Sequence, residues 1–130
     1  MTPYPIVALW AVPRSTSTAF EWMMRMRGDM DCWHEPFGEV WYQGESPDWP
    51  RLEADSLRTP GLTYQSRWVE LQAAAQRGRV FIKDFPLHLT ELWSDEFFAH
   101  FTHSFLIRDP ARTITSMYRQ WPDFDVREVG

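Results

Sequence analysis

Two segments of the sequence place basic and hydroxyl side chains directly after an apolar stretch. The first, 13–18, reads Pro-Arg-Ser-Thr-Ser-Thr and follows the apolar run 6–12. The second starts at Arg108-Asp109-Pro110, follows 104–107, and has Ser116 eight residues after the arginine. A turn from a buried strand into a helix points free backbone N–H groups and the positive helix end at one place, which suits an anion. Two such turns predict a ligand with two separated phosphate groups.

Seven side chains of these segments are the candidate phosphate ligands: Arg14, Ser15, Thr16, Ser17, Thr18, Arg108 and Ser116. Guanidinium and hydroxyl groups both donate hydrogen bonds to phosphate oxygens. Each segment also has a plainer interpretation: an ordinary helix N-cap for the first, and for the second an Arg108–Asp109 ion pair with Ser116 as a small packing residue. No Gly-Lys-Ser/Thr loop follows the first strand, which argues against a nucleoside triphosphate site.

Two further polar pairs stand where other strands are expected to end. Glu35 is the preferred candidate for a general base, and His34 is the second candidate. Lys83, next to Asp84, is a candidate cation for stabilising developing negative charge. The plainer interpretation of Glu35 is a carboxylate that pairs with an arginine. His100 and His103 lack the neighbours that would complete a metal shell, so no metal site is predicted.

The apolar patterns predict the elements that position these residues. Strands are expected at 5–12, 30–33, 79–84 and 103–107. Helices are expected at 18–27, 63–77, 87–101 (in one or two pieces) and 110–120, with an irregular segment at 38–61. This order predicts a single α/β unit over residues 1–130, with a mainly parallel sheet of about four strands flanked by helices. Ligands of such sheets bind outside the carboxyl ends of the strands, where all the polar segments fall.

Composition narrows the function classes. The chain has 130 residues, 44% of them hydrophobic, and a net charge of −5, which argues against a general nucleic-acid binder. The single Cys32 fits a reducing compartment. The longest apolar run, 6–12, is far shorter than a membrane span. We therefore expect a cytoplasmic protein with no nucleic-acid or membrane partner.

Together, 13–18 and Arg108-Asp109-Pro110 with Ser116 resemble the two phosphate motifs of the sulfotransferase family. Ile82-Lys83-Asp84-Phe85-Pro86 and His34-Glu35-Pro36-Phe37 also look like segments found in its members. The resemblance implies a fold related to P-loop enzymes and a sulfuryl donor, 3′-phosphoadenosine 5′-phosphosulfate, used without a metal. It implies that a small molecule or sugar accepts the sulfuryl group on a hydroxyl or amine.

By this resemblance, Arg14 and residues 15–18 bind the 5′-phosphosulfate, and Arg108 and Ser116 hold the 3′-phosphate. Arg14 and Lys83 are then the cations near the leaving group. The chain departs from the family in two respects. Members that act on small hydroxyl compounds carry a histidine shortly after the strand-three lysine, where this chain has Phe85, which favours a carboxylate base. Members are also generally longer, so the chain is expected to lack the family's C-terminal part.

Two rival functions stay open. One is a P-loop-like kinase or phosphotransferase, which would need Mg²⁺ and ATP. The other is a non-catalytic binding or interaction protein that keeps the fold. The sequence does not identify the acceptor and leaves the oligomeric state open, a homo-oligomer included.

Overall fold

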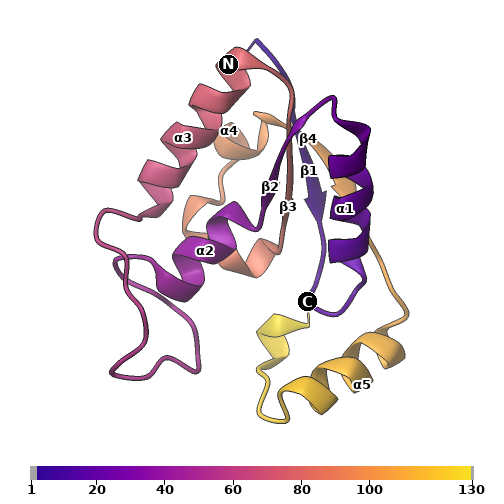
Figure 1. Cartoon of the computed structure of the whole chain (residues 1–130). Coiled ribbons are helices and arrows are strands. Elements are labelled where there is room, and N and C mark those ends of the chain that lie inside the picture. The colour runs from indigo at the N-terminus through magenta and orange to yellow at the C-terminus, as the bar shows by residue number, and fades with distance from the viewer. Residues whose placement is uncertain (1–2, 130) are drawn as a thin grey trace.

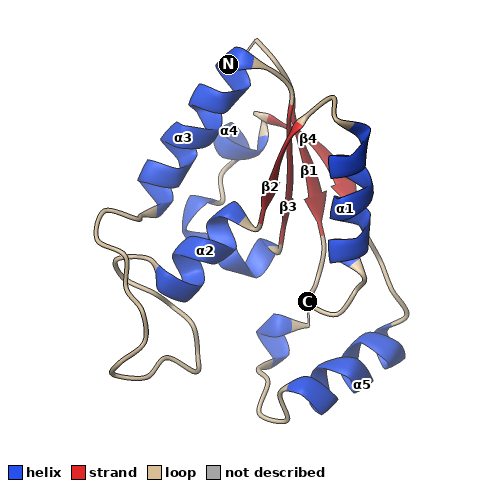
Figure 2. Cartoon of the chain, viewed as in Figure 1, coloured by secondary structure: helices blue, strands red, loops and turns tan. Residues whose placement is uncertain are grey.

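The sheet contains four strands, all parallel, in the order β2-β3-β1-β4 (Figures 1 and 2). The computed structural model describes residues 3–129. The strands are β1 (Ile6–Trp10), β2 (Asp31–His34), β3 (Val80–Asp84) and β4 (Phe101–Phe105). In the register, Ile6 of β1 lies opposite Val80 of β3 and Phe101 of β4. The predicted parallel α/β sheet is confirmed, although β4 begins and ends two residues earlier than predicted.

The main helices are α1 (Ser17–Arg27), α2 (Pro36–Gln43), α3 (Tyr64–Arg77), α4 (Asp95–Phe98) and α5 (Pro110–Gln120). Two 3₁₀ turns cover Pro86–Leu92 and Val126–Glu128. Gly28 ends α1 with a φ of 73°, a left-handed conformation that glycine adopts without strain. Thr63 begins α3 through a capping box with Ser66. The predicted helical stretch 87–101 is two short pieces, and Ser94 caps the second, as the sequence suggested.

The prediction of an irregular segment over 38–61 is wrong at its start, because α2 occupies Pro36–Gln43. The cause lies in a distant strand. The buried carboxylate of Asp84 accepts the backbone N–H groups of Phe37 at 2.8 Å and Gly38 at 3.3 Å. These are donors that a helix start leaves unpaired, so Asp84 acts as the N-terminal cap of α2. Pro36 supplies the φ that suits the first helical position.

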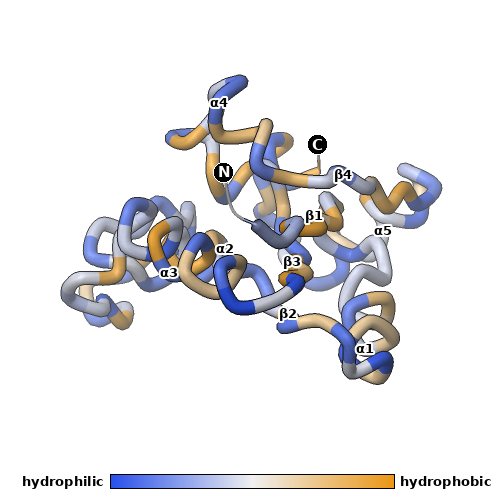
Figure 3. The backbone as a smooth tube through the Cα atoms, turned by 90° about the horizontal axis from the view of Figure 1, so that it is seen from above, coloured by the Kyte–Doolittle hydropathy of each residue, from blue (hydrophilic) through white to orange (hydrophobic). Residues whose placement is uncertain are grey.

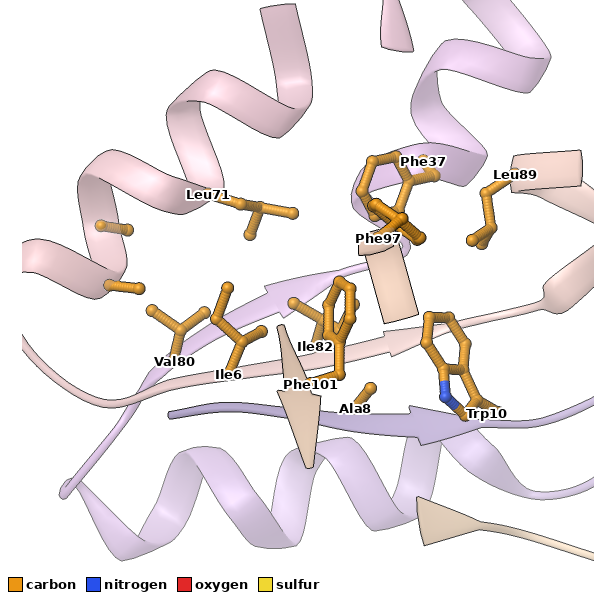
Figure 4. Close-up of a cluster of buried hydrophobic side chains, with 12 residues drawn as sticks. Ile6, Ala8, Trp10, Phe37, Leu71, Val80, Ile82, Leu89, Phe97 and Phe101 are labelled. Carbon is orange, nitrogen blue, oxygen red and sulfur yellow. The ribbon is translucent and has the colours of Figure 1, made fainter. Parts of the chain in front are cut away.

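The two faces of the sheet carry separate apolar clusters. Twelve buried residues, from the strands, α2, α3, the 3₁₀ turn 86–92 and α4, pack on one face (Figure 4). On the other face, Leu9 and Phe81 pack against Met24 of α1. Full burial of each large apolar side chain contributes about 1.5–3 kcal/mol.

Helix α5 lies beyond the carboxyl ends of the strands, near the C-terminal 3₁₀ turn (Figure 1). Figure 3 shows α5 at the same side of the sheet as α1, away from α2 and α3. This arrangement brings 110–120 toward the turn that follows β1. None of the helices within residues 3–129 combines the length and the apolar character needed to cross a membrane.

Candidate functional site

The segment between β1 and α1 forms a tight loop. Arg14 and Thr16 have positive φ values of 64° and 68°, which non-glycine residues rarely adopt. The Ser15 hydroxyl donates to the Val12 carbonyl at 2.6 Å and holds the turn. Strained backbone of this kind persists where the surrounding structure fixes it, often at ligand sites.

The loop leaves its backbone donors free. Within residues 3–129, no protein group accepts a hydrogen bond from the backbone N–H groups of residues 14–18. Thr16 occupies the N-cap position of α1, but its hydroxyl bonds to the Ser15 carbonyl and makes no capping bond. The interpretation of 13–18 as an ordinary N-cap is therefore wrong, because no serine or threonine hydroxyl in the described part of the chain caps α1. Free amides at a helix start form an anion-binding concavity.

The second candidate segment lies directly against this loop. The Arg108 Nη1 donates to the Arg14 carbonyl at 2.5 Å, and the Arg14 Nε donates to the Ser116 hydroxyl at 2.9 Å. Asp109 caps α5 by accepting the Ala111 N–H at 2.9 Å, so the alternative Arg108–Asp109 pairing is not what the structure contains. Segments more than ninety residues apart thus meet at one point.

A cavity of about 260 Å³ opens between the two segments. Its lining residues are Arg14, Thr16, Ser17, Thr18, Phe85 and Arg108. Ser15 is buried inside the loop, and the Ser116 hydroxyl is held by Arg14. Two guanidinium groups, hydroxyls and free amides therefore gather around one cavity, which we call the basic cavity.

A second cavity, also of about 260 Å³, adjoins the first and shares Arg14, Thr18 and Phe85 with it. It adds the acid–base candidates His34 and Glu35. Most of the other lining residues are aromatic or paired side chains: Trp41, Tyr42, Arg51, His88, Trp121 and Glu128. We call it the aromatic cavity. A group bound there would lie beside an anion held at the basic cavity.

Glu35 begins α2 with a φ of 41°, and its carboxylate forms an ion pair with Lys83. Lys83 is completely buried, with its amine 4.8 Å from the centre of the Phe85 ring. A buried ammonium requires a counter-charge, and Glu35 supplies it. The plainer interpretation of Glu35 paired it with an arginine, whereas the structure pairs it with Lys83. Glu35 lines the aromatic cavity, but Lys83 is not among the residues that line either cavity.

His34 is positioned by a residue that sequence reasoning missed. Its Nδ1 lies 2.7 Å from Oε2 of Glu21, and its Nε2 lies 3.8 Å from Oε1 of Glu35. Glu21, on α1, is only 2% exposed, and Arg25 pairs with its other oxygen at 3.1 Å. The only signal in the sequence was a carboxylate beside the apolar positions of α1.

His88 is the second residue that the sequence did not single out. Its Nδ1 lies 2.8 Å from Oδ1 of Asp84, and both side chains are buried. Its ring packs against Trp41 and Phe85 with centroids 4.8 and 5.1 Å away. Among residues 3–129, no partner reaches His88 Nε2. Because Asp84 also caps α2, this pair fixes the wall of the aromatic cavity.

Arg51 also lines the aromatic cavity. It forms an ion pair with Glu128 and lies 5.7 Å from the Trp49 ring and 5.6 Å from the Trp121 ring. Arginine between two aromatic faces gains cation–π attraction. Arg51 thus ties the 44–62 loop to the C-terminal segment 121–129.

The two histidines considered as a metal pair have other roles. His103 accepts from the Trp10 indole at 2.8 Å and donates to the Phe98 carbonyl at 3.0 Å, while the His100 ring packs on Trp68. In the part of the chain that the structure describes, no three His, Cys, Asp or Glu side chains gather as metal ligands.

Comparison with known proteins gives no relative from which a function could be carried over. No family model matches the chain, and neither a curated protein nor a solved structure matches it.

Proposed function

We propose that this chain is a sulfotransferase of P-loop-like topology that uses 3′-phosphoadenosine 5′-phosphosulfate. The observation that carries the proposal is the contact between 13–18 and the Arg108–Ser116 segment around the basic cavity. These are the two segments that resemble the family's phosphate motifs. Arg14 and the free amides of residues 14–18 would bind the phosphosulfate, and Arg108 and Ser116 the 3′-phosphate.

The adjoining aromatic cavity would hold the acceptor. A hydroxyl or amine of a small molecule or sugar would lie between the phosphosulfate and the acid–base pair His34 and Glu35. In sulfuryl transfer, negative charge develops on the bridging oxygen of the leaving phosphate, and a fixed cation there lowers the barrier. Arg14 lines both cavities and is the cation in that place. Lys83 would act through Glu35, its ion-pair partner. We place the reaction in the cytoplasm, which suits a free Cys32.

Calorimetric titration with 3′-phosphoadenosine 5′-phosphate, the desulfated product, tests this function. We expect micromolar binding that Arg108→Ala weakens at least tenfold and that ATP with Mg²⁺ does not match. Arg112→Ala is the matched control, because Arg112 is an exposed arginine in the first turn of α5, four residues after Arg108, and lines neither cavity.

The rivals give different results. Tighter binding of ATP with Mg²⁺ would favour a kinase. If a folded sample binds neither nucleotide, a non-catalytic interaction protein becomes the leading function. Either result would overturn the sulfotransferase proposal.

A further inference from the structure

A buried carboxylate and a half-exposed imidazole are joined at the edge of the aromatic cavity. Glu21 lies on α1, the helix that follows the loop 13–16, and His34 is the last residue of β2. The Glu21 side chain is 3% exposed and that of His34 is 49% exposed. One end of this pair is therefore inside the protein, and the other faces the cavity.

The contact fixes the tautomer of the imidazole. An ionised carboxylate can only accept hydrogen bonds, so Nδ1 of His34, 2.7 Å from Glu21, carries the hydrogen. Arg25 pairs with the other oxygen, Oε1, at 3.1 Å, which leaves Oε2 to accept from His34. In the neutral imidazole, the lone pair is then on Nε2. A buried carboxylate plays the same part for the histidine of serine hydrolases.

Glu35, the other acid–base candidate, is the ion-pair partner of Lys83. Its Oε1 pairs with the buried Lys83 ammonium, which has no other counter-charge among residues 3–129. Taking a proton onto Glu35 would leave that ammonium unpaired in the interior, which is strongly unfavourable. Protonation of His34 would leave no buried charge unpaired, and its Nε2 is 3.8 Å from the same Glu35 oxygen.

We infer that Glu21 is a positioning residue that makes His34 Nε2 the proton acceptor of the transfer. The inference rests on the proposed function. The acceptor oxygen or nitrogen would form a bond to sulfur while its hydrogen passes to Nε2. The bond from sulfur to the bridging oxygen breaks, and the electron pair leaves with the bisphosphate. Glu35 stays ionised beside the imidazolium formed.

Imidazole ¹⁵N spectroscopy tests the positioning directly. With the ring neutral, and with His34→Gln assigning the signal, we expect the Nδ1–H tautomer in the native chain. Glu21→Met, which removes both acceptor oxygens at similar volume, should lose that preference. Glu21→Gln, which keeps one acceptor oxygen, should restore part of it.

Kinetics test the consequence. Glu21→Met should lower kcat by roughly 10²–10⁴-fold with little change in KM for the donor. Met24→Ala, a buried change on the same helix in the cluster with Leu9 and Phe81, controls for loss of stability. Full kcat in a folded Glu21→Met, an equal loss in Met24→Ala, or a native Nε2–H tautomer would overturn the inference while leaving the proposed function in place. Absence of bisphosphate binding by the native chain would overturn the proposed function and the catalytic role with it.

Discussion

Arg14 donates a hydrogen bond from Nε to the hydroxyl of Ser116 over 2.9 Å, although 102 residues separate them in sequence. The Arg108 guanidinium reinforces this contact by donating to the Arg14 carbonyl. In the structure, the two segments therefore satisfy each other's polar groups. A ligand with two phosphates would have to replace these contacts with its own. The side chains that hold the loop are therefore the ones expected to bind the phosphates.

Ser116→Ala is predicted to weaken bisphosphate binding about five- to tenfold, because it removes one hydrogen bond of about 1 kcal/mol. Calorimetry of the variant gives the affinity. Thr115→Ala is the control, since the Thr115 hydroxyl bonds to the Ala111 carbonyl inside α5. Unchanged or tighter binding by Ser116→Ala would mean that Ser116 only restrains Arg14 and contacts no phosphate.

Removing one partner of the Glu35–Lys83 ion pair is predicted to destabilise the protein more than replacing both partners. Glu35→Gln leaves the ammonium of Lys83, which is 0% exposed, without a counter-charge. We expect the free energy of unfolding to fall by about 3–5 kcal/mol. Replacing both residues, by Lys83→Met with Glu35→Gln, should restore most of it.

Urea unfolding of the parent, both single variants and the double variant gives the coupling energy. The prediction would be contradicted if the free energy of unfolding lost in the double variant equalled the sum of the losses in the two single variants. That result would mean that water already compensates the charge of Lys83.

Local patterns were enough to predict most of the fold. The apolar run 6–12 marks β1, Gly28 marks the end of α1, and Pro110 marks the start of α5, all confirmed within a residue or two. Each of these signals acts within a few residues of its own position. The arrival of Arg14 and Arg108 at one edge follows from the rule that parallel strands end on the same side.

The parts that could not be predicted depend on distant partners. Helix α2 begins where Asp84 of β3 accepts its first N–H groups, and no local feature of 36–43 shows that cap. Glu21, four residues before Arg25, reads as half of a surface ion pair, yet it lies against β2 and reaches His34. His88 follows Asp84 by four residues, and the turn 86–92 places its Nδ1 2.8 Å from Oδ1 of Asp84.

Gly38 is predicted to tolerate no side chain, because a Cβ there would lie 2.7 Å from Nδ1 of His88. Overpacking of this kind costs about 1–3 kcal/mol. Gly38→Ala should therefore lower the urea midpoint, whereas Gly78→Ala, which meets no atom within 4 Å, should not. In a His88→Ala background, Gly38→Ala should have a smaller effect than in the parent. An equal effect in both backgrounds would contradict the clash with His88 and point instead to Glu35, whose Cβ would lie 3.0 Å away.

Tyr42 is predicted to make the protein's stability fall at high pH. Burial in the wall of the aromatic cavity, reinforced by the carboxylates of Glu35 and Glu128, raises the pKa of Tyr42 to about 12, from an ordinary value near 10. Below about pH 10 the phenol is neutral in both states, and its contribution to stability is fully present. Between about pH 10 and 12 the unfolded chain releases the proton and the folded chain keeps it, so unfolding becomes more favourable as pH rises.

Urea unfolding at a series of pH values, with Tyr42→Phe as the comparison, measures this effect. The parent should lose more stability than the Phe variant between about pH 10 and 12. Tyr64, whose pKa burial also raises, is present in both proteins, so the difference between them reports Tyr42 alone. The phenolate absorbance of the folded parent minus that of the Phe variant should show one transition, displaced from about pH 10 toward about pH 12. If the two unfolding curves stay parallel through this range, Tyr42 is solvated in the folded protein, and the wall of the aromatic cavity is open at that point.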